Sequence, residues 1–168
     1  MGVYAVDKLM QEARRLAAEY RRATGQPLGI SGEIAEYDAA RLLGLEIIKD
    51  PSLGYDAVGH GAHEGRRIQI KGRVIFDERK QAHRLGQLNL DREWDSVILV
   101  LMDEDYQPVE IHEAQRQDIE VALAEPASSK RNKRGAMSVA KFKIIGRMIW
   151  NNVEGEVPDD IWDNQAQT

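Results

Sequence analysis

The chain has 168 residues, 42% of them apolar, and a formal net charge of −5 at neutral pH. This length and apolar content predict one globular domain with a substantial core. The absence of cysteine excludes disulfide bonds, thiol catalysis and zinc sites built from cysteine. No apolar run reaches the roughly 18 residues of a membrane span and no signal-peptide pattern opens the chain, so we expect a cytoplasmic protein without a membrane partner.

The first part of the chain predicts two helices. Residues 5–23 predict an amphipathic helix, because apolar side chains recur there at spacings of three and four. These side chains are Leu9, Ala13, Leu16 and Tyr20. A second helix is predicted from Ser31, as its N-cap, to Leu43, with Gly44 ending it.

Strands dominate the middle of the chain. The segments that predict them are residues 45–48, 54–58, 66–73, 96–102 and 109–112. The glycine-rich loop 59–65 joins the second and third of these into a hairpin. The fourth is apolar enough to be buried on both faces, and the fifth is its hairpin partner. Residues 77–93 leave a loop and a short helix open as alternatives.

The last part predicts helices and a tail. Residues 114–125 predict a helix, and a basic loop follows at 126–135. Ser138 is a predicted N-cap for a segment with helical spacing that continues to residue 149, although a strand over 139–145 remains an alternative. Residues 153–168 carry five acidic side chains and no basic one, so we expect an acidic flexible tail there.

Taken together, these elements predict an α/β fold. No repeat or linker divides residues 1–152, so we expect one layered domain with a mixed sheet flanked by helices.

Charge is segregated along the chain. Residues 66–84 hold seven basic and two acidic side chains, and residues 126–150 hold seven basic and none acidic. Residues 85–125, by contrast, hold two basic and eleven acidic side chains. Because phosphate contacts depend on nearby charge, the two basic blocks predict a nucleic-acid partner despite the negative total.

Asp56 and the tripeptide Gln69-Ile70-Lys71 form the candidate site. Side chains two apart on a strand share a face, so Gln69 and Lys71 project together, and Asp56 on the paired strand can meet them. An acidic oxygen, an amide oxygen and an ammonium suit a hydrated Mg²⁺ and a scissile phosphate. Glu33, on the preceding helix, can add a second carboxylate. The alternative is an edge strand whose exposed lysine discourages aggregation.

These residues resemble a known family. A helix with Glu33, then Gly-Tyr-Asp56, then Ile-Gln69-Ile-Lys71 resembles the PD-(D/E)XK, or restriction-endonuclease-like, nuclease superfamily, and the Gln-x-Lys form resembles its Mrr-type branch. The resemblance covers about residues 30–115. It differs from the usual pattern in that glutamine replaces an acid and no proline precedes Asp56.

The resemblance implies a fold and an activity. The fold would be a three-layer restriction-endonuclease-like domain with a mixed sheet of four to five strands. The activity would be Mg²⁺-dependent endonuclease cleavage, with Mn²⁺ able to substitute, in restriction or repair. Asp56, Gln69 and Lys71 would match the motif's acid, (D/E) position and lysine, with Ile70 lending a carbonyl to the metal. Glu33 would match the helical acid, and Glu36 competes for that role.

A set of basic side chains is predicted to hold the nucleic-acid backbone without reading its sequence, with DNA favoured over RNA. They are Arg66, Arg67, Arg73, Arg79, Lys80, Arg84, Lys130, Arg131, Lys133 and Arg134. For the last four, a solvated loop is an equal alternative.

Other interpretations stay open at this level. His60 and His63 form a histidine pair that we expect on an exposed hairpin tip rather than on a metal. A catalytically inactive nucleic-acid-binding or protein-interaction module of the same fold is the alternative function. A regulatory partner that works through its acidic 85–125 surface is a third. The oligomeric state is also open, a homodimer included.

Overall fold

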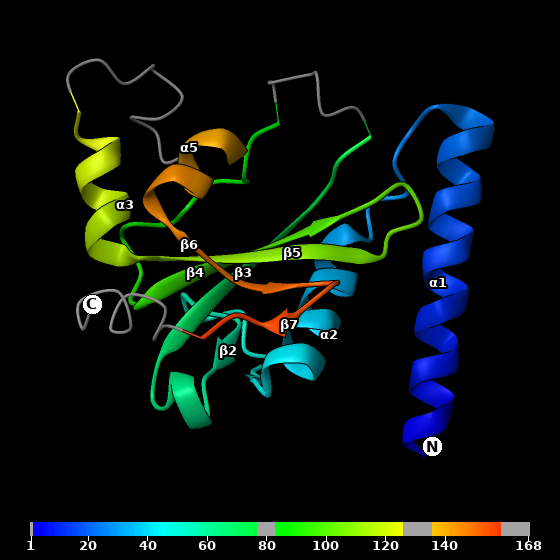
Figure 1. Cartoon of the computed structure of the whole chain (residues 1–168), viewed down its shortest axis with the longest axis horizontal. Coiled ribbons are helices and arrows are strands. Elements are labelled where there is room, and N and C mark those ends of the chain that lie inside the picture. The colour runs from blue at the N-terminus through cyan, green and yellow to red at the C-terminus, as the bar shows by residue number, and fades with distance from the viewer. Residues whose placement is uncertain (1, 77–82, 126–135, 159–168) are drawn as a thin grey trace, which may run out of the picture.

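The computed structural model describes residues 2–76, 83–125 and 136–158, in which helices lie on both faces of a mixed sheet (Figure 1). The helices are α1 (Val3–Thr24), α2 (Ser31–Leu43), α3 (Arg116–Leu123) and α5 (Val139–Ile145), with a short 3-10 helix, η1 (Gly61–His63). The strands are β1 (Glu46–Ile47), β2 (Ala57–Val58), β3 (Arg67–Val74), β4 (Ser96–Met102), β5 (Pro108–Gln115), β6 (Arg147–Asn151) and β7 (Gly155–Glu156).

The order of the strands in the sheet follows the order of the chain, from β1 to β7. β3 and β4 are parallel, and every other neighbouring pair among these seven strands is antiparallel. β3 pairs with β4 along residues 68–74, whereas its pairing with β2 covers only Arg67 and Ile68. At Lys71 the strand therefore has a neighbour on the β4 side only, so the pairing is compatible with the interpretation of this lysine as a feature of an edge strand.

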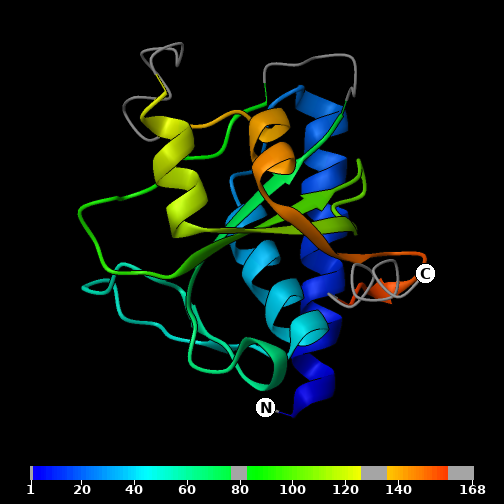
Figure 2. The ribbon, with the colours of Figure 1, turned by 60° about the vertical axis from the view of Figure 1, so that its left-hand side comes forward.

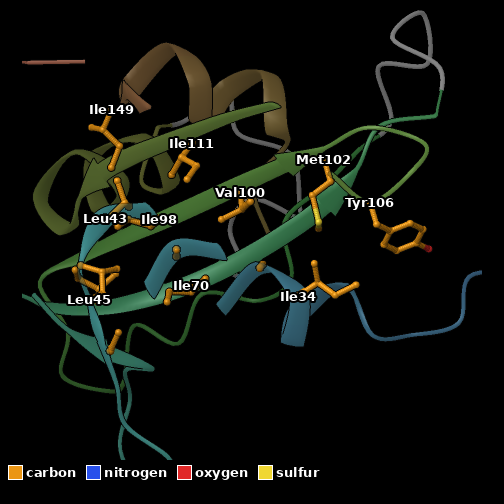
Figure 3. Packing of buried hydrophobic residues seen from close by; sticks show 14 of the residues in the cluster. Ile34, Leu43, Leu45, Ile70, Ile98, Val100, Met102, Tyr106, Ile111 and Ile149 are labelled. Atoms are coloured by element: carbon orange, nitrogen blue, oxygen red, sulfur yellow. The ribbon is translucent and has the colours of Figure 1, made fainter. Parts of the chain in front are cut away.

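The core has two parts, one on each face of the sheet. Every residue of β4 is buried, and its alternate side chains point into different parts because successive side chains of a strand face opposite ways. One part joins β4 to α1 and α2 and contains Ile98, Val100 and Met102 (Figure 3). The other joins β4 to α3 and α5 and contains Val97, Leu99 and Leu101. Figure 2 shows these helix pairs on either side of the sheet.

Most locally encoded elements are confirmed. The two N-terminal helices, the hairpin of β2 and β3, the buried strand β4, its partner β5 and the helix α3 all occur where the sequence predicts them. Ser138 caps α5, since its hydroxyl accepts a hydrogen bond from the N–H of Lys141 at 3.1 Å. Of the ambiguous segment, residues 83–93 form no helix, and Arg84 makes an isolated β-bridge to Ser138.

Other predictions are wrong. The N-cap of α2 is Ile30, and Ser31 is the first helical residue. The described residues form seven strands instead of four or five. The helix after Ser138 ends at Ile145, because residues 147–151 pair with β5 and become β6.

The predicted tail also begins in the sheet, since β7 pairs with β6 and the N–H of Val157 donates to Ile149. The rest of that tail, residues 159–168, lies outside the described residues, as does the basic loop 126–135.

The apolar row of α1 is not its buried side. A row of this kind on a helix of a globular protein normally packs on the core. Here Ala17 and Ala18 are buried against the sheet and α2, whereas Leu9, Leu16 and Tyr20 are exposed. No helix of the described residues is both long and apolar enough to cross a membrane.

Candidate active site

β3 separates apolar from polar side chains. Ile68 and Ile70 point into the core that α1 and α2 cover. Gly72 points the same way, and a Cβ at this position would stand 2.5 Å from the Cβ of Ala35 on α2, so the helix lies directly on the strand. Gln69 and Lys71 alternate with these residues and therefore occupy the opposite face, as the sequence predicts.

Asp56 stands just before β2, fixed against the edge of β3. Its N–H donates to the carbonyl of Ile68 and its carbonyl accepts from the N–H of Ile48, both at 2.8 Å. Its carboxylate Oδ2 accepts from the N–H of Ile70, also at 2.8 Å. The N–H and C=O of one strand residue point to the same edge, so the carbonyl of Ile70 faces the Asp56 side as well. Asp56 and Ile70 thus bring two oxygens to this edge.

Lys71 is partly buried, on the face of β3 away from α2. Its Nζ donates to the carbonyl of Gln87 at 3.3 Å. Burial lowers the pKa of the ammonium, the negative charge of Asp56 opposes this, and the positive charge of Arg73 adds to it. The Asp56 carboxylate thus favours the charged form of Lys71.

Gln69 is almost completely buried, with 4% of its surface exposed. Its side-chain nitrogen donates to the carbonyl of Gly54 at 3.0 Å. This hydrogen bond ties β3 to the segment that carries Asp56. The Gln69 side chain therefore links β3 to the segment before β2, and its amide nitrogen is already bonded to the Gly54 carbonyl.

Arg73 continues the polar face of β3. Its Nε donates to the carbonyl of Arg84 at 2.5 Å, its Nη1 donates to the carbonyl of Gly72 at 2.6 Å, and burial lowers its pKa. A Cβ at Gly86 would stand 3.4 Å from the Arg73 guanidinium and 3.7 Å from the Lys71 Nζ. Residues 84–87 therefore cover both cations, and neither cation forms an ion pair with a carboxylate within the described ranges.

The two helical acids do not join Asp56. Glu33 is largely exposed (73%) and Glu36 less so (21%), and both pair with Lys49, at 3.7 and 2.8 Å. Lys49 follows Ile48, whose N–H donates to the carbonyl of Asp56, so the ion pairs of Lys49 link α2 to the segment next to Asp56. No group of three or more histidine, aspartate or glutamate side chains suited to a metal occurs in residues 2–76, 83–125 and 136–158.

Several of the predicted phosphate-contacting arginines have protein partners. Arg66 pairs with the buried Glu113 at 2.9 Å, and Arg67 pairs with Asp95 at 3.1 Å. Arg84 donates to the carbonyl of Ala136. Apart from Arg73, described above, the remaining members of the set lie outside the described residues, namely Arg79, Lys80, Lys130, Arg131, Lys133 and Arg134.

The two histidines of the glycine loop differ in surroundings. His60 is exposed, as the sequence predicts, and contacts Glu46 at 3.0 Å. The same prediction is wrong for His63, which is mostly buried because it packs 3.7 Å from the buried Glu113, with its Nδ1 3.3 Å from Arg66. The two rings thus serve separate contacts.

Sequence reasoning missed the segment that covers the site. Gln87 contributes a backbone carbonyl, which any residue type would provide, so no sequence pattern marks it. Gly86 alone hints at a close approach, because a side chain there would meet the two cations. No family model and no curated protein matches this chain.

Proposed function

We propose that this chain is a metal-dependent nuclease with a restriction-endonuclease-like fold, which hydrolyses phosphodiester bonds of nucleic acid, DNA in preference to RNA. The position of Lys71 carries the proposal. Its ammonium is partly buried beneath residues 84–87, on the face of β3 away from α2, and is bonded only to a backbone carbonyl among the described residues. A lysine that merely kept a strand soluble would extend into water.

The residues present fit a hydrated Mg²⁺ or Mn²⁺, because these ions prefer oxygen ligands. The Asp56 carboxylate, the Ile70 carbonyl and the Gln69 amide oxygen would hold the ion. With a single negative charge among these ligands, several waters would remain on it. When bound, the ion would polarise a phosphate oxygen and acidify a bound water.

Lys71 would act on the reacting phosphate. A lowered pKa lets its Nζ accept a proton from an attacking water more readily than a solvated lysine does. In its charged form, the same group would offset the negative charge that builds on the phosphorus in the transition state. Arg73, beside it, would hold the nucleic-acid backbone.

A helical acid would complete the metal site after a local rearrangement. Lys49 pairs with both Glu33 and Glu36 as the structure stands. Glu36 is the less exposed of the two, so it competes strongly with Glu33 for this role. Release of either carboxylate from Lys49 would add the second negative charge that Mg²⁺ sites commonly contain.

Cleavage assays with both metals on DNA and RNA test this function. We expect the wild type to cleave, and Asp56→Ala and Lys71→Ala each to lower the rate by about 10²-fold or more, as the loss of electrostatic stabilisation does in other enzymes. His60→Ala, at an exposed position away from β3, should cleave like the wild type. Circular dichroism should show all four proteins folded. Absence of cleavage by the wild type on every substrate would refute the proposal.

The second candidate is a nucleic-acid-binding module without catalysis. The observation in its favour is that, among the described residues, Asp56 is the only carboxylate hydrogen-bonded to the Gln69-Ile70-Lys71 tripeptide, while Gln69 is engaged with Gly54. Salt-dependent nucleic-acid binding without metal-dependent cleavage would select this function.

A further inference from the structure

α1 carries a row of exposed apolar side chains along one border of its buried face. Val6, Leu9, Leu16 and Tyr20 are 43%, 51%, 55% and 41% exposed, and Ala13 lies between them, half-buried. Figure 1 shows α1 at one edge of the molecule. Large apolar side chains that gather in one row on a surface mark an interaction site more often than single ones do.

The spacing of the row specifies the shape of its partner. Positions 6, 9, 13, 16 and 20 alternate steps of three and four, which is the repeat of a helix that packs along a second helix. Residues 10, 14 and 17, at neighbouring positions, face the body of the protein. The free row therefore runs beside the body for about two heptads and suits one further helix.

The charges beside the row indicate that the partner helix is α1 of a second copy. Glu12 and Glu19 follow its solvent border, and Lys8 and Arg15 lie behind them on the same helix. In an antiparallel pair centred on Ala13, Glu12 of one copy lies opposite Arg15 of the other, and Glu19 opposite Lys8. In a parallel two-fold pair, this border would instead meet the opposite, body-facing border of the other copy, so these four charges would not pair with one another.

The apolar residues obey the same symmetry. Rotation about Ala13 brings Val6 of one copy opposite Tyr20 of the other, and Leu9 opposite Leu16. The small Ala13 meets its own copy at the centre, where the backbones can approach closely. A surface that complements itself in this way is what a two-fold interface requires.

We propose that this face of α1 is the docking surface for a second copy of the chain, in an antiparallel helix pair centred on Ala13. The inference is independent of the proposed nuclease activity. Because the row spans only two heptads, the dimer forms and dissociates with concentration.

Analytical ultracentrifugation over a wide concentration range tests the dimer. The wild type should shift from monomer to dimer, and Leu16→Glu should remain monomeric, because it buries a charge in the apolar row. The matched control is Ile144→Glu on α5, where an exposed apolar residue lies elsewhere on the surface, and it should dimerise like the wild type. A wild type that stays monomeric, or a Leu16→Glu variant that dimerises, would overturn the proposal.

The absence of cysteine allows a clean test of the orientation. A short bis-maleimide reagent should cross-link Ala13→Cys to itself, and Val6→Cys to Tyr20→Cys in a mixture. Val6→Cys alone should not cross-link, since its two copies lie about 21 Å apart along an antiparallel pair. Efficient cross-linking of Val6→Cys to itself would contradict the antiparallel arrangement.

Discussion

At the scale of single residues, the buried and partly buried charges differ in the groups that they contact. Arg14 and Asp38 form a buried ion pair that joins α1 to α2, and Arg14 also donates to the carbonyl of Tyr106 at 2.6 Å. Lys71 and Arg73 are instead bonded to carbonyl oxygens. The first arrangement joins two helices of the fold, whereas in the second no carboxylate of the described residues pairs with the cation.

Removal of one partner from the buried pair should be costly. Arg14→Met leaves Asp38 buried with only the more distant Arg41, at 3.4 Å, so we expect the free energy of unfolding to fall by about 3 kcal/mol. Arg15 is the next residue in the chain, and it forms an exposed ion pair with Glu19. Arg15→Met should therefore lower the free energy of unfolding by less than about 0.5 kcal/mol. Urea denaturation measures both, and equal losses would show that Arg14 has no special role.

Lys71 should make stability depend on alkaline pH. Its pKa is lowered in the folded state, so the unfolded chain binds more protons between the folded and the unfolded pKa, and stability rises with pH across that window. Lys71→Met lacks this dependence. Its stability advantage over the wild type should therefore be largest at neutral pH and shrink as the pH approaches about 10.4. A difference that does not change with pH would contradict the burial of this ammonium.

At the scale of elements, the close contact of α2 with β3 positions the site. A Cβ at Gly72 would stand 2.8 Å from the carbonyl oxygen of Ser31 as well as against Ala35. Backbone atoms cannot give way cheaply, so Gly72→Ala should lower stability by about 1–3 kcal/mol. Gly32→Ala, on the same helix with nothing within 4 Å, should be neutral or slightly stabilising. Thermal denaturation of the two variants compares them, and a stable Gly72→Ala would show that the helix can move away.

Elements encoded by local patterns could be predicted from the sequence. The two N-terminal helices, the buried strand β4 and the Ser138 cap depend on residues close together in the chain. β6 could not be predicted, because residues 147–151 continue a helical spacing and become a strand only by pairing with β5. The row on α1 misleads for a related reason, since periodicity shows that a face is apolar but not what covers it.

In the candidate site, too, the features set by local sequence could be predicted and those set by tertiary packing could not. The shared face of Gln69 and Lys71 follows from the two-residue period of a strand, and the meeting with Asp56 follows from the hairpin. The contacts of Lys49 with Glu33 and Glu36 come from tertiary packing, as do the covering segment 84–87 and the carboxylates that pair with Arg66 and Arg67.

At the scale of the whole molecule, the two faces of the sheet differ in what they carry. The face with α1 and α2 supports the strands from behind. The opposite face presents Gln69, Lys71 and Arg73 beneath residues 84–87. If the helix pair on α1 forms, it joins two copies along a surface that does not include these three residues.

Metal binding tests the central claim most directly, because it does not depend on the choice of nucleic-acid substrate. A titration with Mn²⁺, followed by the electron paramagnetic resonance signal of the free ion, should show binding by the wild type. Asp56→Asn, which removes the charge and keeps the shape, should weaken that binding at least about tenfold. Asp118→Asn, at an exposed acid on α3, should bind like the wild type. Equal Mn²⁺ affinity of the wild type and Asp56→Asn would contradict a metal centre at this site.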